Sequence, residues 1–397
     1  MTERVFRNAL LADGATADLA VRDGRFVERD AIGDAADVVD LGGLLMLPGF
    51  VDGHIHLDKS FVGDRWRPHE PVGTLRERLA VEKRLLAEAR PIAERADALI
   101  ARAFAHGTVA MRSHVDVDAT TGLANLHAVM EARDRWADRV AIELVAFPQA
   151  GILTCPGTAE VLDAALRAGA DVVGGIDPET LDGDSAGHLD IVFGLAERHG
   201  VPVDIHLHEN GEGGIAQLER IAAWTTRAGM GGRVTVSHAY ALGDVDERAA
   251  RATAGVLAEA GVAIVTNAPG DHPFPPVALL RAEGVRVFAG NDNIRDAWWP
   301  YGDGDMLQRA MMIGYRSGLY TDEELRLALE MATTGAARAL GLDGYGIAPG
   351  HPATFVVLDA DNAAAAVAAP PAERVLVLRG EIVRPSGTGL AERLAFA

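Results

Sequence analysis

The chain of 397 residues, with 49% hydrophobic and 24% charged residues, has the length and composition of a globular protein with one large domain and a smaller module, not of a disordered one. Its formal net charge of −20 would repel nucleic-acid phosphates and anionic membrane surfaces, so neither is an expected partner. The single cysteine, Cys155, excludes an internal disulfide and a thiolate metal cluster, which is typical of a cytoplasmic protein.

Short strands are predicted at the start of the chain. The segment "RNALLADGATADLAVRDGRFVERD" alternates short apolar runs with turns built on Gly and Asp, which favours β structure. The N-terminus, "MTERVFRNALLADGA", lacks the apolar core of a signal peptide, and no stretch approaches the ~20 apolar residues of a membrane span. Residues 1–47 are therefore predicted to be the N-terminal part of a small β domain.

Residues 48–342 alternate short apolar runs with longer segments rich in Ala, Leu, Arg and Glu, the pattern of strands that alternate with helices. Eight such units predict an α/β fold, the (β/α)₈ TIM barrel, whose functional groups lie at the carboxyl ends of the strands. The predicted strands read "GFVDGHIHL", "GTVAMRSHVDV", "VAIELVAFPQ", "ADVVGGID", "VPVDIHLHE", "RVTVSHA", "GVAIVTNAP" and "GVRVFAGND".

Residues 343–397 return to short strands, "PATFVVLDAD" and "ERVLVLRGEIVRP". The simplest arrangement joins both chain ends into one small β-sandwich that flanks the barrel. The predicted division is therefore 1–47, 48–342 and 343–397, with the first and third segments forming one domain.

Ionisable side chains follow the apolar bodies of several predicted strands. His54 and His56 lie two apart in the first strand and point to one face, although alone this pair is also consistent with two structural histidines. His206, His238 and Asp292 end the fifth, sixth and eighth strands, and parallel strands bring these positions to one rim. Neutral imidazoles and a carboxylate suit Zn²⁺ or Fe²⁺, and the lack of thiolates argues against a purely structural zinc.

The chain resembles the amidohydrolase superfamily, and within it the cytosine deaminase-like branch. The motifs "HIHLDK", "HVDVD", "VAFPQAGIL", "DIHLHE", "VTVSH" and "DNIRDAWWPYGDGDML" follow the order and spacing of that branch across nearly the whole chain. The resemblance implies that His54, His56, His206 and Asp292 bind one divalent metal ion, Zn²⁺ or Fe²⁺, together with a water molecule. Two-metal members commonly carry a modified lysine at the end of the fourth strand, and "VVGGIDPE" offers none.

The resemblance also implies roles for four further residues. Glu209 matches the proton-shuttling glutamate, His238 would face the water, Gln149 matches the glutamine that hydrogen-bonds the ring, and Trp298 matches the pocket tryptophan. Metal coordination lowers the pKa of water from ~16 toward ~7 and supplies hydroxide, which would attack the ring carbon that carries the exocyclic amine. Asp292 could take the proton of the water, while Glu209 protonates the adjacent ring nitrogen and helps ammonia leave.

Two positions depart from the pattern of the branch. Asn293 stands where the branch carries a second aspartate directly after the metal ligand, so recognition of the ring edge should differ. Arg295 replaces a phenylalanine and could pair with an anionic substituent of the substrate. Both residues are therefore predicted to bind substrate, together with Gln149 and Trp298.

The predicted function is a metal-dependent aminohydrolase, a hydrolase acting on C–N bonds other than peptide bonds, that deaminates cytosine or a related aminopyrimidine. The rivals are an aminotriazine or N-alkylaminotriazine hydrolase, a cyclic-amide hydrolase, and a catalytically silent ligand-binding barrel. The expected partner is a small heterocyclic substrate, and the sequence leaves a homo-oligomer open. It also leaves open whether four pocket-edge residues contact substrate: His114, His208, Asp58 and Lys59.

Overall fold

The structure is a computed structural model that describes residues 2–33, 35–270, 272–383 and Leu390. The chain forms two compact units. The first comprises Met1–Val51, Arg102–Ala110 and Asp305–Ala397, and the second comprises Asp52–Ala101 and Met111–Gly304. The division of the sequence at residues 48 and 343 stays a prediction.

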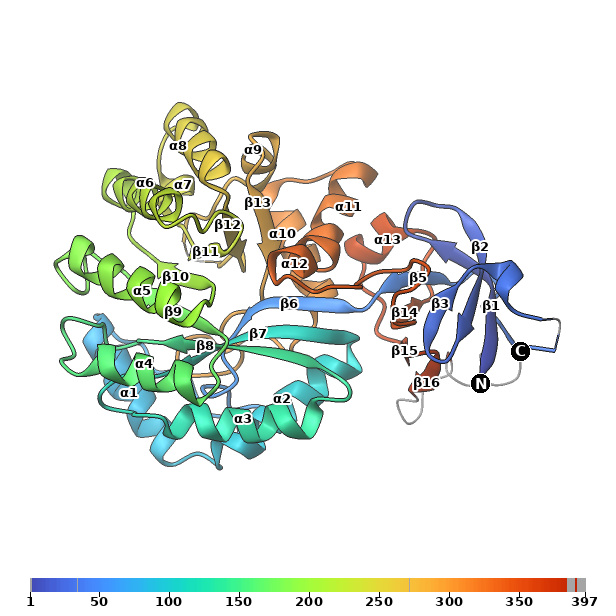
Figure 1. Ribbon diagram of the computed structural model, residues 1–397, viewed down its shortest axis with the longest axis horizontal. Helices are drawn as coiled ribbons and strands as arrows, with labels where there is room; N and C mark the ends of the chain where they lie inside the picture. The colour runs from blue at the N-terminus through green and yellow to red at the C-terminus, as the bar shows by residue number, and fades with distance from the viewer. Residues whose placement is uncertain (1, 34, 271, 384–389, 391–397) are drawn as a thin grey trace. The chain divides into compact units, whose positions relative to one another are not determined.

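Both chain ends contribute to one sheet (Figure 1). Its strands run in the order β16-β15-β14-β5-β1-β2-β3, with β4 paired to β1. β14 pairs antiparallel with β5, which joins the C-terminal strands to the N-terminal ones and confirms the predicted small β domain. The strands are β1 (Glu3–Leu11), β2 (Thr16–Arg22), β3 (Arg25–Val27), β4 (Asp37–Asp40), β5 (Leu45–Pro48), β14 (Phe355–Leu358), β15 (Arg374–Leu378) and β16 (Glu381–Val383).

Aromatic rings from both chain ends build the core of this sheet. Phe6 and Phe355 are fully buried, and their ring centroids lie 4.9 Å apart in an edge-to-face arrangement. Such pairs add to the stabilisation that burial of the rings already gives. A buried ion pair lies in the same unit, where Arg374 donates two hydrogen bonds of 2.6 Å to the carboxylate of Asp305.

The second sheet is a nearly closed parallel barrel, as predicted. Its order is β13-β12-β11-β10-β9-β8-β7-β6, and a parallel bridge between Ile55 and Asp292 links the two ends of that order. A side chain at Gly290 would place its Cβ 2.5 Å from the Cβ of His54, so only glycine permits this approach. The strands are β6 (Phe50–Ile55), β7 (Thr108–Asp116), β8 (Ala141–Phe147), β9 (Val172–Ile176), β10 (Val203–Leu207), β11 (Val234–His238), β12 (Val262–Thr266) and β13 (Arg286–Ala289).

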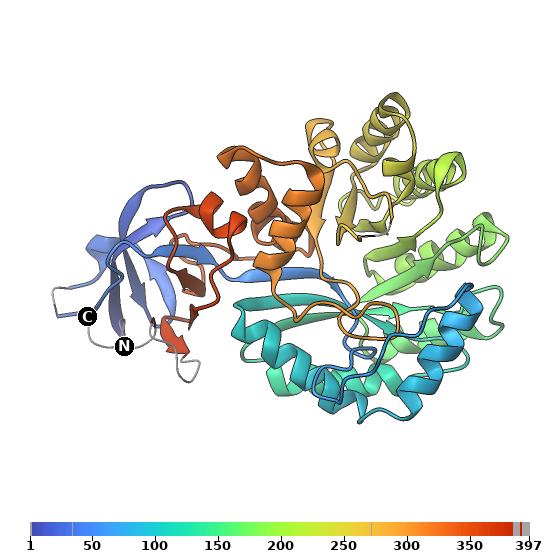
Figure 2. The same ribbon diagram turned by 180° about the vertical axis from the view of Figure 1, so that it is seen from behind.

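Helices alternate with the barrel strands and lie on the outer face of the sheet (Figure 2). α5 shows why: Asp184 caps its first turn by accepting from the amide of Gly187, its apolar residues face inward, and Gly200 ends it with a φ of 69°. The helices are η1 (Arg29–Ala31), α1 (Leu75–Ala87), α2 (Ile92–Ala105), α3 (Ala124–Trp136), α4 (Thr158–Ala168), α5 (Ser185–His199), α6 (Gly211–Arg227), α7 (Ala241–Asp244), α8 (Glu247–Ala260), α9 (Val277–Ala282), α10 (Met306–Ser317), α11 (Asp322–Met331), α12 (Thr334–Ala339) and α13 (Ala363–Ala368). Among the described residues, every helix is too short or too polar to cross a bilayer.

Candidate active site

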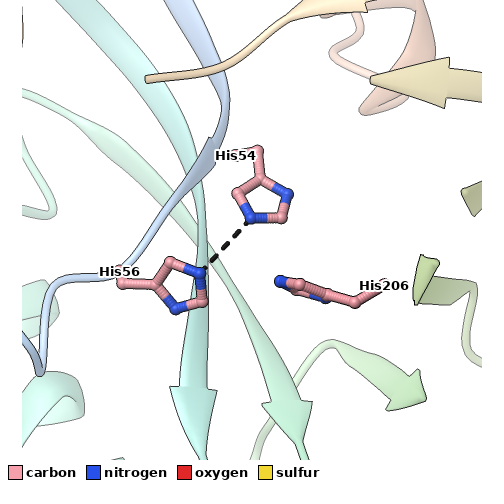
Figure 3. A group of neighbouring side chains, drawn as sticks. All are labelled: His54, His56 and His206. Carbon is pink, nitrogen blue, oxygen red and sulfur yellow. Dashed lines mark hydrogen bonds between the residues drawn. The ribbon is translucent and has the colours of Figure 1, made fainter. Parts of the chain in front are cut away.

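The residues predicted to bind metal meet at the carboxyl ends of the barrel strands. His54 lies on β6, His56 directly follows it and His206 lies on β10, and Figure 3 shows the three rings converging. The Nε2 atoms of His54 and His56 are 3.4 Å apart, and one ring nitrogen from each histidine lies within 4.8 Å of the others. Oδ1 of Asp292 lies 3.4 Å from Nε2 of His54 and 3.3 Å from Nε2 of His56.

This cluster has the chemistry of a metal site. Both ring nitrogens of His206 are buried and have no hydrogen-bond partner in the described part of the chain, which is unusual for buried polar atoms. Burial lowers the pKa of His56 to about 3 and holds the pKa of His206 well below its usual range, so both imidazoles are neutral. Burial alone would raise the pKa of Asp292, but its close contacts with His54 and His56 outweigh this effect and hold that pKa low. Neutral imidazoles and an ionised carboxylate fit Zn²⁺ or Fe²⁺.

A buried series of hydrogen-bonded side chains holds Nδ1 of His54. Nδ1 of His54 lies 2.9 Å from Oγ of Ser237, which donates its proton to Asp204 at 2.7 Å, and Asp204 also accepts from Arg112 at 2.9 Å. Because the hydroxyl proton of Ser237 goes to Asp204, its oxygen is left to accept from Nδ1–H of His54. This tautomer leaves Nε2 of His54 unprotonated and able to bind a metal ion.

We expect Ser237→Ala to weaken metal binding by about 10–100-fold, because the partner that fixes the tautomer and orientation of His54 is lost. Metal affinity would be measured by competition with a chelator. Ser317→Ala is the matched control, since its buried hydroxyl has no partner among the described residues. An unchanged metal affinity in folded Ser237→Ala protein would rule out this supporting role.

His238 and His208 form a stacked pair at the end of β11 and β10. Their ring centroids lie 4.5 Å apart with an interplanar angle of 25°, and both residues line a cavity next to the metal-ligand cluster. Asp177 accepts from the amide of His208 at 2.7 Å and contacts its Nδ1 at 2.8 Å. Burial would lower the pKa of His208, but the carboxylate of Asp177 outweighs it and raises that pKa. His208 is therefore a cavity residue held in place by Asp177.

Glu209 is buried, and hydrogen bonds hold its carboxylate group through one oxygen, Oε1. Its Oε1 accepts from the amides of Glu179 at 3.0 Å and Thr180 at 2.8 Å, and from the hydroxyl of Thr180 at 3.2 Å. Its Oε2 is buried and has no partner among the described residues. One carboxylate oxygen is thus fixed in place, and the other has no hydrogen-bond partner among the described residues.

A cavity of about 550 Å³ adjoins the metal-ligand cluster, a size that suits a small molecule. Glu209 and Arg295 are not among the described residues that line it. Its walls include His56, Lys59, Arg78, Phe147, Gln149, Asp177, His206, His208, His238, Tyr240, Asn267, Asp292, Asn293, Trp298 and Trp299. The structure thus brings Gln149, Asn293 and Trp298 together with the metal-ligand cluster.

Arg295 lies away from this group. Its guanidinium lies 5.8 Å from the ring centroid of Trp66, and it lines a separate small hollow with that residue. The backbone turns at Arg295 through a φ of 46°, a conformation that the sequence pattern did not indicate. Arg295 is therefore not among the residues that line the cavity, and its role in binding substrate stays a prediction.

Two of the residues left open by the sequence lie behind the cavity wall. His114 stacks on His54 with ring centroids 3.9 Å apart, and both its nitrogens lack a hydrogen-bond partner among the described residues. The carboxylate of Asp58 accepts from the amide of Asp116 at 3.0 Å and from Asn125 at 3.2 Å. Neither His114 nor Asp58 is among the lining residues, which favours a supporting role for both.

Sequence reasoning missed several supporting residues. Asp204 lies two positions before His206 on β10, so strand alternation could have placed it on the same face. Asn267, which donates to Oδ2 of Asp292 at 2.8 Å, and Asp296, which lies in the loop after β13, carried no comparable signal. Loops bring these two residues to the site, and strand periodicity says nothing of loop positions.

Known proteins provide an independent comparison. Residues 37–384 match the Amidohydrolase family, so the chain belongs to this family of metal-dependent hydrolases. It is 34% identical over 368 residues to N-isopropylammelide isopropyl amidohydrolase of Pseudomonas sp. strain ADP, which covers 89% of this chain and 90% of that one. The match confirms the predicted hydrolase that acts on C–N bonds.

Two solved structures are similar over nearly their whole length. N-isopropylammelide isopropylaminohydrolase from Burkholderia multivorans has a TM-score of 0.92 and 41% identity, covering 96% of this chain and 98% of that one. 5-Methylcytosine deaminase from Klebsiella pneumoniae, with 5-fluorocytosine bound, has a TM-score of 0.86 and 29% identity and covers 98% of both chains.

Proposed function

We propose that this protein hydrolyses the bond between a ring carbon and an exocyclic alkylamine on an oxo-substituted triazine, with N-isopropylammelide as the reference substrate. Similarity to the two N-isopropylammelide hydrolases, at 34% and 41% identity over most of the chain, supports this choice. The cytosine deaminase-like pattern has an aspartate at the position of Asn293. This difference supports a substrate whose ring edge differs from that of cytosine. The deamination of cytosine first inferred from the sequence becomes the second candidate.

One divalent ion, Zn²⁺ or Fe²⁺, would be held by His54, His56, His206 and Asp292. When bound, it would lower the pKa of a water molecule to near neutrality and so supply the nucleophile. The single observation that carries the proposal is that these four side chains converge, and that His56, His206 and Asp292 line a cavity sized for a small molecule.

The remaining steps belong to the side chains of this protein. Asp292 accepts a proton from the attacking water, and His238 stabilises the charge that develops on the attacking oxygen. Glu209 takes the other proton of the water on Oε2 and passes it to the ring nitrogen, while Oε1 stays bound to Glu179 and Thr180. Asp292 then gives its proton to the leaving amine as the bond between the ring carbon and the amine breaks, so both carboxylates return to their starting state. Trp298 lines the cavity, where its ring would stack on the flat substrate.

A substrate panel tests this proposal. Protein loaded with Zn²⁺ or with Fe²⁺ would be given N-isopropylammelide, ammelide, cytosine, 5-methylcytosine and a cyclic amide such as dihydrouracil, with products identified by mass spectrometry. Release of isopropylamine with an intact ring, at the highest kcat/KM of the panel, is the expected result. Preferential release of ammonia from cytosine or 5-methylcytosine would favour the second candidate, which similarity to 5-methylcytosine deaminase supports.

Two other outcomes would contradict both candidates. A ring-opened product from the cyclic amide would make the protein a cyclic-amide hydrolase. No turnover by metal-loaded protein on any substrate would favour the silent ligand-binding barrel. A cytoplasmic location and the exclusion of nucleic acid stay predictions from the sequence, and a homo-oligomer stays open.

A further inference from the structure

Two buried charges each contact one amide side chain of the cavity wall. We propose that Lys59 and Asp296 are positioning residues that orient the amides of Gln149 and Asn293, so that Gln149 turns its NH₂ group and Asn293 its carbonyl oxygen toward the substrate. This inference rests on the proposed function and narrows the substrate class. The cavity selects rings with a lactam edge, whose carbonyl faces Gln149 and whose N–H faces Asn293.

Lys59 fixes the first amide. Its ammonium donates a hydrogen bond to Oε1 of Gln149, and it is held by Asp116 at 3.0 Å and by Glu82 at 3.7 Å. An ammonium has donors only, so the Gln149 atom that it contacts must be the carbonyl oxygen. Burial would lower the pKa of Lys59, but the carboxylates around it outweigh this effect and keep it charged. The NH₂ group of Gln149 is therefore the part left for a ligand.

Asp296 fixes the second amide with the opposite polarity. Its Oδ2 accepts from Nδ2 of Asn293 at 2.6 Å, while Oδ1 accepts from the amides of Trp298 and Trp299, both at 2.8 Å. An ionised carboxylate has acceptors only, so Asn293 must turn its NH₂ group toward Asp296. The carbonyl oxygen of Asn293 is then the part left for a ligand, and Asn293 lines the cavity.

An amide with a fixed orientation can distinguish ligands by their pattern of hydrogen-bond donors and acceptors, whereas an amide that rotates freely cannot. An amide that is free to rotate can exchange its oxygen and nitrogen and so accept either pattern of donors and acceptors. With Gln149 and Asn293 fixed, a ring with the reversed pattern leaves buried polar groups unpaired, which costs binding free energy. Triazines and pyrimidines with a carbonyl next to a ring N–H satisfy both amides, whereas fully aminated rings satisfy neither.

Binding of two non-identical but isosteric rings tests this inference without requiring turnover. Uracil and 2,4-diaminopyrimidine have the same shape, and each donor of one ring is replaced by an acceptor in the other. Their dissociation constants for the metal-loaded protein would be measured by calorimetry at pH 8, where Asp296, whose pKa burial raises to about 6, is ionised. We expect the wild-type protein to prefer uracil.

The decisive variant is Asp296→Asn. Its carbonyl oxygen can still accept from Trp298 and Trp299, but its NH₂ group now faces Asn293, which must rotate and present its own NH₂ group to the ligand. We expect the ratio of the two dissociation constants to shift by about tenfold or more toward 2,4-diaminopyrimidine. Asp138→Asn, at an exposed position, is the matched control and should leave the ratio unchanged.

Gln149→Glu provides a second variant should Asp296→Asn not fold. The new carboxylate keeps the contact with Lys59 and presents an oxygen in place of N–H groups, so we expect a shift in the same direction. The inference is overturned if the wild-type protein binds neither ring or prefers 2,4-diaminopyrimidine, or if a folded variant keeps the wild-type ratio. If the wild-type protein prefers uracil and a variant shifts the ratio toward 2,4-diaminopyrimidine, but the wild-type protein hydrolyses no substrate of the panel, the inference is upheld and the proposed function is rejected.

Discussion

Replacing Glu209 with glutamine is expected to lower kcat by ~10²–10⁴-fold, the usual contribution of a positioned acid or base, while metal content stays unchanged. Oε1 of Glu209 accepts from the amides of Glu179 and Thr180, and the amide oxygen of glutamine can keep these hydrogen bonds. Oε2 is the buried oxygen without a partner in the described part of the chain, and its replacement by NH₂ removes the group that would exchange the proton.

Turnover of the best substrate and metal content by elemental analysis would be measured on the same Glu209→Gln preparation. Glu212→Gln is the matched control, because Glu212 is exposed in the first turn of the next helix, α6. Turnover within about threefold of the wild-type value, with metal bound, would remove Glu209 from the mechanism.

His206→Phe is expected to abolish metal binding and turnover together. The ring of His206 stacks on Phe147 with centroids 4.0 Å apart and an interplanar angle of 26°, a contact that phenylalanine can keep. Both nitrogens of His206 lack partners among the described residues, so no hydrogen bond is lost with them. Loss of a direct ligand should exceed the 10–100-fold cost of losing a supporting partner, so we expect metal affinity to fall by more than about 100-fold.

Metal affinity, turnover and thermal unfolding of the metal-free protein would be compared for His206→Phe and for His127→Phe, which changes an exposed histidine of α3. The expected result is an intact fold in both variants and metal loss only in His206→Phe. Stoichiometric metal in folded His206→Phe protein would contradict the assigned ligand set.

The periodicity of the strands in the sequence was enough to predict the fold and to predict that the expected metal ligands lie at one rim of the barrel. His54 and His56 share a face because side chains alternate along β6, and His206 lies at the same end of the barrel because all its strands are parallel. The joining of both chain ends into one sheet was also predictable, since short strands separated by turns occur at both ends.

The orientation of residues beyond the strand ends was not predictable from the same pattern. His238 and Asp292 have φ values of 73° and 61°, and Asp177 has a φ of 36°, so the chain leaves several strands through left-handed turns. Such turns decide which way the next side chains point. They explain why Arg295 faces another hollow and why Asp296 went unnoticed.

The most direct measurement is a titration of metal-free protein with Zn²⁺, and separately with Fe²⁺, while amine release from the best substrate of the panel is followed. One metal ion bound by His54, His56, His206 and Asp292 predicts no activity before metal is added, a linear rise, and a plateau at one equivalent per chain. Turnover in rigorously metal-free protein, or a plateau at two equivalents, would contradict the single-metal hydrolase.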